Sequence, residues 1–196
     1  DMVIMSQLEG CDPDKIQRYH ESKRMASKPY VLWQLDFARV FREKGGFDIV
    51  IGNPPYIGEE GNKEIFQEVA NTEFGKKYYI GKMDFWYFFT SKGMQLLAPN
   101  GSLSFIAPNN WMTTAGGKNM RKHIAEKGKL KKFVTFNNVM VFESASQQTM
   151  IFLIQNKKQD SEYKVSYKAV GNRSLNASEL SQFLNGNNIG IMYNAK

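Results

Sequence analysis

Residues 47–56 have the sequence Phe-Asp-Ile-Val-Ile-Gly-Asn-Pro-Pro-Tyr, and the rest of the chain is interpreted relative to them. The apolar run of Ile49, Val50 and Ile51 favours a strand that is buried on both faces of a parallel sheet. Two prolines follow, and because each lacks a backbone N–H and has a fixed φ, the strand ends at Asn53. Ligands of open α/β sheets bind at the carboxyl ends of the strands. The stretch therefore predicts a strand that leads directly into an active-site turn.

This turn offers groups that can recognise a flat molecule with an amine. Asn53 provides an amide oxygen, Pro54 a carbonyl oxygen and Tyr56 an aromatic ring. The two oxygens suit the hydrogens of an NH2 group, and the ring suits the face of a planar substrate. The exocyclic amine of a nucleobase and a carboxamide both fit this description. The alternative is a rigid surface turn in which Asn53 acts only as a cap.

The sequence Asn-Pro-Pro-Tyr after a buried strand resembles the catalytic motif of S-adenosylmethionine-dependent amino-methyltransferases, above all the adenine-N6 DNA methyltransferases. Its longer context, residues 33–57, is similar to the bifunctional type II restriction-modification enzymes. Glutamine and ribosomal-RNA methyltransferases share the tetrapeptide, so the context is the more specific part. The resemblance implies a three-layer, Rossmann-like α/β methyltransferase fold with a mostly parallel sheet.

The resemblance also assigns roles to residues around the target base. Asn53, Pro54, Pro55 and Tyr56 are the expected catalytic residues, and the ring of Tyr56 is expected to stack on the base. Phe142 is the best match to an aromatic residue that closes the pocket on the opposite side. The alternative for Phe142 is a loop phenylalanine packed under the sheet.

The expected cofactor is S-adenosylmethionine, and the resemblance places Asp36, Phe37 and Asn53 in its site. In the resembling enzymes an acid at the position of Asp36 accepts from the amino group of the cofactor's adenine. An aromatic at the position of Phe37 packs on that ring. Alternatively, Asp36 caps the short helix that follows it and Phe37 belongs to the core.

Strand and helix patterns alternate along the chain. Strands are predicted at residues 30–37, 103–107, 133–136, 150–154 and 163–167. Helices are predicted at residues 13–25, 84–97 and 117–127, with one more inside a flap at residues 58–83. This order predicts a parallel sheet with right-handed crossovers. After residue 167, Gly, Asn and Ser dominate and no further element is predicted.

The expected fold is incomplete in its N-terminal half. Only Gly10, Gly45 and Gly46 precede residue 47, and none lies in the Gly-rich strand-to-helix turn with which family members close on the cofactor's methionine end. We therefore expect a piece of a longer polypeptide, inactive alone, with cofactor-binding, target-recognition and, in the bifunctional case, nuclease regions elsewhere. The predicted parts are a helical lead-in (1–28), the C-terminal half of a methyltransferase catalytic domain (29–160) and a connection toward a target-recognition region (161–196).

The positive net charge of the chain indicates what kind of partner it binds. The net charge of +7 favours a polyanion, and with the resemblance this means double-stranded DNA. Lys118, Arg121 and Lys122 lie in the most basic segment and are candidate phosphate contacts. The alternative is an ordinary solvated helix face.

Other classes of site find little support in the sequence. No Cys/His cluster suggests a metal site, and the single cysteine, Cys11, fits a reducing cytoplasm and excludes an internal disulfide. No apolar run has the roughly 20 residues that a membrane helix needs. Pro13-Asp14 and residues 21–23 match the letters of a magnesium nuclease site, but that site requires strands and this segment has a helical pattern.

Taken together, the sequence predicts transfer of a methyl group from S-adenosylmethionine to the N6 amine of a flipped adenine in DNA, within a restriction-modification system. Two alternatives remain open. One is a methyltransferase that acts on a protein glutamine amide or an RNA base. The other is a non-catalytic DNA-binding remnant.

Overall fold

The computed structural model describes residues 31–136, 141–142, 147–159, 163–170, 176–185 and 190–195, and residues 17, 21 and 24 singly. The chain divides into two compact units, Asp1–Lys44 and Gly45–Lys196, which are described separately. The helix predicted at residues 13–25 lies almost entirely outside the described residues.

The described part of the first unit is helical, with α3 (Trp33–Asp36) and α4 (Ala38–Lys44). The strand predicted at residues 30–37 is therefore wrong. The backbone N–H of Asp36 donates to the Leu32 carbonyl at 2.7 Å, which is a helical bond. The rings of Trp33 and Phe37, four residues apart, stack with centroids at 5.9 Å. Contacts between residues three to four apart thus make this segment helical. Its alternating apolar residues do not form a strand, because no described strand pairs with them.

The second unit contains one sheet and several helices. Its strands are β1 (Phe47–Gly52), β2 (Leu97–Pro108), β3 (Lys129–Thr135), β4 (Thr149–Gln155), β5 (Val165–Val170) and β6 (Gly190–Ala195). Its helices are α5 (Lys63–Ala70), α6 (Glu73–Tyr78), α7 (Trp86–Leu96), α8 (Lys118–Lys127) and α9 (Ala177–Leu184), with short 3-10 turns η1 (Asn109–Met112) and η2 (Ala115–Gly117). Strands β1 to β5 and helices α7 and α8 fall where the sequence predicts them.

The six-stranded sheet has the order β1-β2-β4-β3-β5-β6. Strands β1 and β2, and likewise β3 and β5, pair in parallel. Strand β4 is antiparallel to both β2 and β3, and β6 is antiparallel to β5. Four of the described strands therefore run in one direction, but most neighbouring pairs are antiparallel. The sequence predicts that neighbouring strands are parallel. This prediction is wrong at β3 and β4, because these consecutive strands lie side by side and pair antiparallel.

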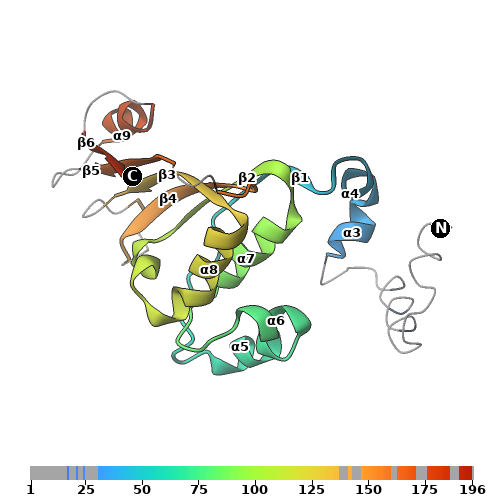
Figure 1. The fold of residues 1–196 in the computed structure, drawn as a ribbon. Helices are drawn as coiled ribbons and strands as arrows, with labels where there is room; N and C mark the ends of the chain where they lie inside the picture. Colours follow the sequence, from blue (N-terminus) through green and yellow to red (C-terminus); the bar gives the residue numbers. More distant parts are fainter. Residues whose placement is uncertain are drawn as a thin grey trace. The chain divides into compact units, whose positions relative to one another are not determined.

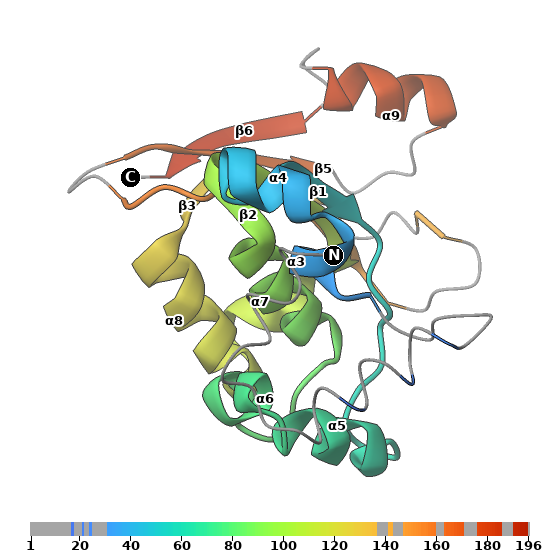
Figure 2. The same ribbon diagram turned by 90° about the vertical axis from the view of Figure 1, so that its right-hand side faces the viewer.

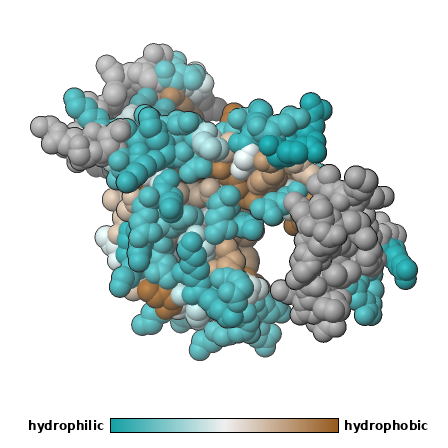
Figure 3. All heavy atoms as spheres, turned by 45° about the vertical axis from the view of Figure 1, so that its right-hand side comes forward, coloured by the Kyte–Doolittle hydropathy of each residue, from teal (hydrophilic) through white to brown (hydrophobic). Residues whose placement is uncertain are grey.

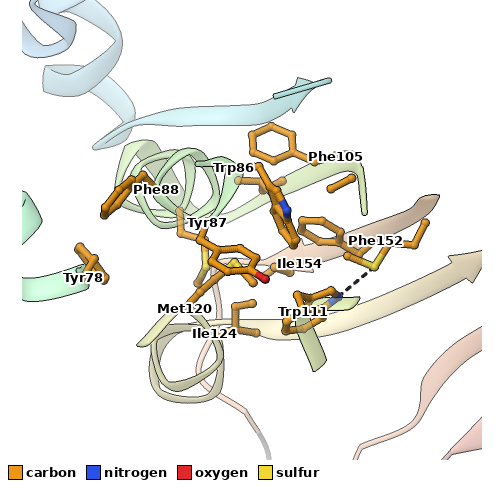
Figure 4. Close-up of a cluster of buried hydrophobic side chains, with 14 of the residues drawn as sticks. Tyr78, Trp86, Tyr87, Phe88, Phe105, Trp111, Met120, Ile124, Phe152 and Ile154 are labelled. Atoms are coloured by element: carbon orange, nitrogen blue, oxygen red, sulfur yellow. Dashed lines mark hydrogen bonds between the residues drawn. The ribbon is translucent and has the colours of Figure 1, made fainter. Parts of the chain in front are cut away.

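Helices cover both faces of the sheet, so the predicted three layers are present. Helices α7 and α8 pack on one face, with α5 and α6 beyond them, and α9 lies on the opposite face (Figures 1 and 2). Figure 4 shows the aromatic core between the sheet and α7 and α8. In that core the indole N–H of Trp111 donates to the Met150 sulfur at 2.9 Å. The fully buried members with the largest side chains include Trp86, Phe66, Phe152, Leu103, Met120 and Ile154.

Strand β1 has one covered face and one open face. Val50 packs against the core beneath α7, whereas Ile49 and Ile51 are 71% and 79% exposed. The prediction that β1 is buried on both faces is therefore wrong for this chain, because no described element covers Ile49 and Ile51. Among the described strands, β1 pairs only with β2 and so forms an edge of the sheet. Figure 3 shows hydrophobic surface, in brown, between hydrophilic areas on one side of the molecule.

Gly46, just before β1, is a position where any side chain should destabilise the sheet. Its φ is +154°, and a Cβ there would lie 2.5 Å from the Leu96 carbonyl oxygen and 2.6 Å from the Ala98 nitrogen. We expect Gly46→Ala to lower the free energy of unfolding by about 2–4 kcal/mol, measured by urea denaturation. Gly58→Ala is the matched control, since nothing lies within 4 Å of a Cβ at Gly58. Equal stability of the two variants would show that the backbone at Gly46 does not approach Leu96 and Ala98 this closely.

Candidate active site at the carboxyl edge of the sheet

The predicted catalytic residues leave the sheet at the carboxyl end of β1. Gly52, the last residue of β1, lies opposite Phe105 of the parallel strand β2. Asn53 is exposed, whereas Pro54 is buried. The turn is therefore anchored by one proline and presents the amide of Asn53 to solvent.

Tyr56 is held in place through its hydroxyl group. The hydroxyl donates to the Ile106 carbonyl of β2 at 3.0 Å, and the half-buried ring packs against the core. Burial, and then the negative charge of Asp84, raise the pKa of Tyr56 to about 12. The hydroxyl therefore stays protonated near neutral pH and keeps its donor, which fixes the orientation of the ring.

The segment after Tyr56 is paired with the start of α7. The Phe85 N–H donates to the Ile57 carbonyl at 2.8 Å, and Gly58 and Asp84 form an antiparallel bridge. These contacts join the two ends of the flap that contains α5 and α6. The turn is thus fixed on its far side as well as at β1.

Glu59 adds side-chain bonds to this pairing. Its carboxylate accepts from the Met83 N–H at 3.0 Å and from the Tyr79 hydroxyl at 2.6 Å. The hydrogen bond to Glu59 is the largest cause of a raised pKa at Tyr79. Glu59 therefore has a structural role in holding the flap closed on itself.

Asp84 is a partly buried acid close to the turn. Burial raises its pKa to about 6, while nearby backbone N–H groups of Phe85, Trp86 and Ile57 oppose part of the shift. From the sequence, Asp84 is expected only at the start of the helix at residues 84–97. Its proximity to Tyr56, 28 residues earlier, depends on the tertiary fold and has no signal in the sequence.

Polar side chains also gather where β2, β3 and β4 reach the same edge. The Asn109 amide nitrogen lies 3.4 Å from the Thr135 hydroxyl and 3.3 Å from the Gln148 side-chain oxygen. The Asn109 N–H donates to the Gln148 carbonyl at 3.1 Å. Asn109 follows the strand predicted at residues 103–107. Thr135, at the end of β3, and Gln148, just before β4, come from distant segments, so their approach to Asn109 has no signal in the sequence.

Phe142 is half-buried and follows Val141, which packs in the cluster between the sheet and α9. Its role as the second wall of a base pocket stays a prediction. Asp36 and Phe37 lie in the first unit, where both are exposed. One carboxylate oxygen of Asp36 accepts from the Leu32 N–H at 2.8 Å. The predicted contact of both residues with a cofactor also stays a prediction.

The three candidate phosphate contacts on α8 differ in their surroundings. Lys118 and Lys122 are exposed, and Lys122 lies 3.8 Å from Glu126. Arg121 instead donates to the backbone carbonyls of Trp111 and Thr114, at 2.5 and 2.8 Å. Arg121 therefore holds the 3-10 turns that follow β2, and the two lysines are the better placed of the three to meet a polyanion.

A small cavity of about 140 Å³ lies between α6 and α8. Its lining is mainly basic and consists of Lys77, Tyr78, Asn119, Lys122, His123, Glu126 and Lys127. His123 is buried, with its Nε2 3.4 Å from the Tyr78 hydroxyl. Burial, and then the positive charge of Lys77, lower the pKa of His123 to about 4.

This shift predicts a pH dependence of stability. His123 stays neutral in the folded chain, whereas in the unfolded chain it gains a proton below about pH 6.5. Its contribution to stability is therefore lost as the pH falls from 6.5 toward 4. We expect His123→Phe to reduce the stability lost between pH 7 and pH 5 by about 1 kcal/mol, after allowance for solvent screening. Urea unfolding of both proteins at both pH values tests this, and equal losses would contradict it.

Within the described residues, no group of three or more His, Cys, Asp or Glu side chains could hold a metal ion. No helix in the described part of the chain is long and apolar enough to cross a membrane.

With this geometry established, comparison with known proteins identifies the family. The family model of the Eco57I restriction-modification methylases matches residues 6–142. The chain belongs to this family. The Eco57I family assignment agrees with the sequence context around the turn that ends β1.

Relatives of this Eco57I-family chain include enzymes of restriction-modification systems. The type II methyltransferase M.HincII of Haemophilus influenzae is 31% identical over 111 residues, which cover 56% of this chain and 22% of that protein. The type II restriction enzyme and methyltransferase RM.Eco57I of Escherichia coli is 26% identical over 116 residues, 58% of this chain and 12% of that protein. The chain thus spans less than a quarter of the length of these curated relatives.

Solved structures share the fold. A protein of Listeria monocytogenes described as a class I S-adenosylmethionine-dependent methyltransferase has a TM-score of 0.52 and 16% identity, covering 73% of this chain and 42% of that one. The type IIL restriction-modification enzyme MmeI, solved with DNA, has a TM-score of 0.52 and 15% identity, covering 76% of this chain and 18% of that one. The Eco57I-family chain therefore has a Rossmann-like methyltransferase fold, as its sequence predicts.

Proposed function

We propose that the full-length protein transfers a methyl group from S-adenosylmethionine to the N6 amine of an adenine in DNA, as part of a restriction-modification system. The observation that carries this proposal is the turn after β1. Its Asn53 amide is exposed, while the Tyr56 ring beside it is fixed by the bond to Ile106. An acceptor next to an oriented ring suits an aromatic amine.

The turn would act by positioning and by hydrogen-bond acceptance. The Asn53 side-chain oxygen and the Pro54 carbonyl would accept the two amine hydrogens, which aims the nitrogen lone pair at the methyl group. These acceptors also stabilise the positive charge that develops on the amine as the new bond to carbon forms. The cofactor would supply a methyl group activated by attachment to a positively charged sulfur.

The target base must leave the duplex to reach the turn, at a cost of a few kcal/mol. Tyr56 would offset part of this cost by stacking on one face of the base, and we assign Phe142 to the other face. Both residues are half-buried. Stacking of this kind contributes about 1–3 kcal/mol per base.

Asp36 and Phe37 fit the adenine end of the cofactor in their chemistry. They are adjacent and exposed, so a carboxylate could accept from an amino group while a ring packs on the purine. Asn53 would lie at the methyl-donating end. The Gly-rich part of the cofactor site is expected in a part of the polypeptide that this chain does not include.

Double-stranded DNA is the proposed partner, and Lys118 and Lys122 are the proposed phosphate contacts. Both are exposed on α8, in a chain of net charge +7. Arg121 would support them by fixing the turn before α8. A target-recognition region, and a nuclease in the bifunctional case, are assigned to other parts of a cytoplasmic polypeptide. The exposed Ile49 and Ile51 agree with a further region that packs on β1.

The test is product analysis with the full-length protein. We expect incubation with labelled S-adenosylmethionine and unmethylated DNA to give N6-methyladenine as the labelled nucleoside after DNA digestion. Label in methylated glutamine of a protein substrate, or in RNA nucleosides, with none in DNA would reject this function for one of the alternatives. Absence of any transfer would favour a DNA-binding remnant.

A further inference from the structure

The cavity between α6 and α8 is a feature that the proposed methyl transfer does not use. It has a volume of about 140 Å³, and its lining contains three lysines and one carboxylate, so it is positive overall. The lysines are Lys77 of α6 and Lys122 and Lys127 of α8. Figures 1 and 2 show the two helices next to each other. The cavity therefore gathers positive charge from two segments that are far apart in the sequence.

Hydrogen bonds hold the walls of this cavity in place. The Asn119 amide of α8 donates to the backbone carbonyls of Tyr78 and Tyr79, at 3.3 and 3.5 Å. The Gln95 amide of α7 donates to the hydroxyl of the buried Tyr78 at 3.1 Å. Contacts among three helices thus form the cavity before any ligand enters it.

His123 of α8 supplies a buried polar group to the lining. The residue is only 9% exposed, and its Nε2 lies 3.4 Å from the Tyr78 hydroxyl. Because that hydroxyl already accepts from Gln95, its own proton is available to Nε2. The proton of the neutral imidazole then lies on Nδ1, which is buried and has no hydrogen-bond partner among the described residues. A buried donor without an acceptor destabilises the fold, so a ligand oxygen at this position would be stabilising.

The charges around His123 favour an anion over a cation. The carboxylate of the lining, Glu126, lies 3.8 Å from Lys122, so a lysine balances it. After burial, the positive charges of Lys77 and Lys127 are causes of the lowered pKa of His123. Both ammonium groups therefore act on the imidazole, and both residues are exposed, so an anion can reach them from solvent. An anion between them would also offset the repulsion of their charges.

We propose that this cavity binds a phosphate group, with Lys77 and Lys127 as its charged contacts and the Nδ1–H of His123 as a buried donor. The volume sets the class of ligand, because a cavity of roughly 150 Å³ accommodates one benzene-sized molecule, and a whole nucleotide is larger. Inorganic phosphate and a backbone phosphate of DNA both supply this chemistry. The inference concerns binding alone and does not depend on methyl transfer.

The first experiment measures binding of inorganic phosphate to the full-length protein by calorimetry, at pH 7 and at constant ionic strength set with chloride. Lys77→Gln and Lys127→Gln remove charges of the lining, and His123→Phe removes the donor but keeps a ring. Lys76→Gln is the matched control, because Lys76 neighbours Lys77 on α6 but lies 2.6 Å from Glu73, outside the lining. We expect each lining variant to weaken phosphate binding about three- to tenfold, and the control to match the wild type.

The second experiment identifies the source of the phosphate from the salt dependence of duplex DNA binding. If a backbone phosphate occupies the cavity, Lys77→Gln and Lys127→Gln should each reduce the slope of log K against log salt by about one, and inorganic phosphate should compete with DNA. If the ligand is inorganic phosphate, both variants should bind DNA as Lys76→Gln does and still bind phosphate more weakly. Either result supports the inference.

The inference is overturned if the lining variants equal Lys76→Gln in both experiments, or if the wild-type protein binds no phosphate and its DNA binding is unchanged by Lys77→Gln and Lys127→Gln. Unchanged phosphate affinity in a folded His123→Phe variant would likewise contradict it. If His123→Phe does not fold, the two lysine variants decide, since both positions are exposed. Failure of the protein to methylate DNA would reject the proposed function and leave the phosphate measurement intact.

Discussion

Replacement of Asn53 by alanine in the full-length protein is expected to lower kcat for adenine methylation by about a hundredfold or more. Loss of one positioned hydrogen-bonding group in an active site commonly has an effect of this size. Asn53 is exposed and Pro54 beneath it is buried, so the substitution removes the acceptor without opening the core. DNA affinity should barely change, because phosphate contacts dominate it.

Two variants sharpen this prediction. Asn53→Asp keeps an acceptor oxygen at the same position and should retain more activity than Asn53→Ala. Asn71→Ala, an exposed asparagine at the end of α5, should behave like the wild type. Single-turnover methylation and DNA binding of all three give the comparison. Near-normal turnover of Asn53→Ala would move catalysis away from this turn.

Removal of the Tyr56 ring is the second large effect that we expect. With a fluorescent adenine analogue at the target position, Tyr56→Ala in the full-length protein should weaken base capture by about 1–3 kcal/mol. Tyr56→Phe separates the two functions of the residue, because it keeps the ring and loses the bond to Ile106. That variant should capture the base but lose about 1 kcal/mol of stability.

Phe142→Ala tests the other wall in the same assay. A smaller change in fluorescence and slower turnover, with phosphate-driven binding intact, is the expected result. If both fluorescence and turnover match the wild type, Phe142 belongs to the packing around Val141 and the second wall lies elsewhere. The assignment of Tyr56 would stand in that case, because its place in the turn is fixed independently.

Local patterns predicted most of the second unit. Helix α7 forms within the helix predicted at residues 84–97, with its aromatic residues Trp86, Tyr87 and Phe88 in the core. The basic segment of α8 forms a helix that ends at Lys127, also as predicted. Helix α9 was missed, although Asn176 and Glu179 form a capping box and Phe183 is an apolar anchor. The Gly-, Asn- and Ser-rich composition around α9 concealed this short amphipathic signal.

What the sequence could not predict depends on pairing between distant segments. The apolar run of β1 suggests burial on two faces, but burial requires a partner layer, and Ile49 and Ile51 have none among the described elements. The turn itself was placed correctly because two prolines act locally. The closeness of Asp84 to Tyr56, and of Arg121 to the carbonyls before α8, arises only when the sheet and helices pack.

The most direct test of the account is a structure of the full-length protein bound to its DNA and to a cofactor analogue. The account predicts an adenine turned out of the duplex, with its N6 atom about 2.7–3.2 Å from the Asn53 side-chain oxygen and from the Pro54 carbonyl oxygen. Its ring should lie against Tyr56. An adenine that remains stacked, or a base or amide bound at a site remote from residues 53–56, would contradict the assignment of this turn as the catalytic centre.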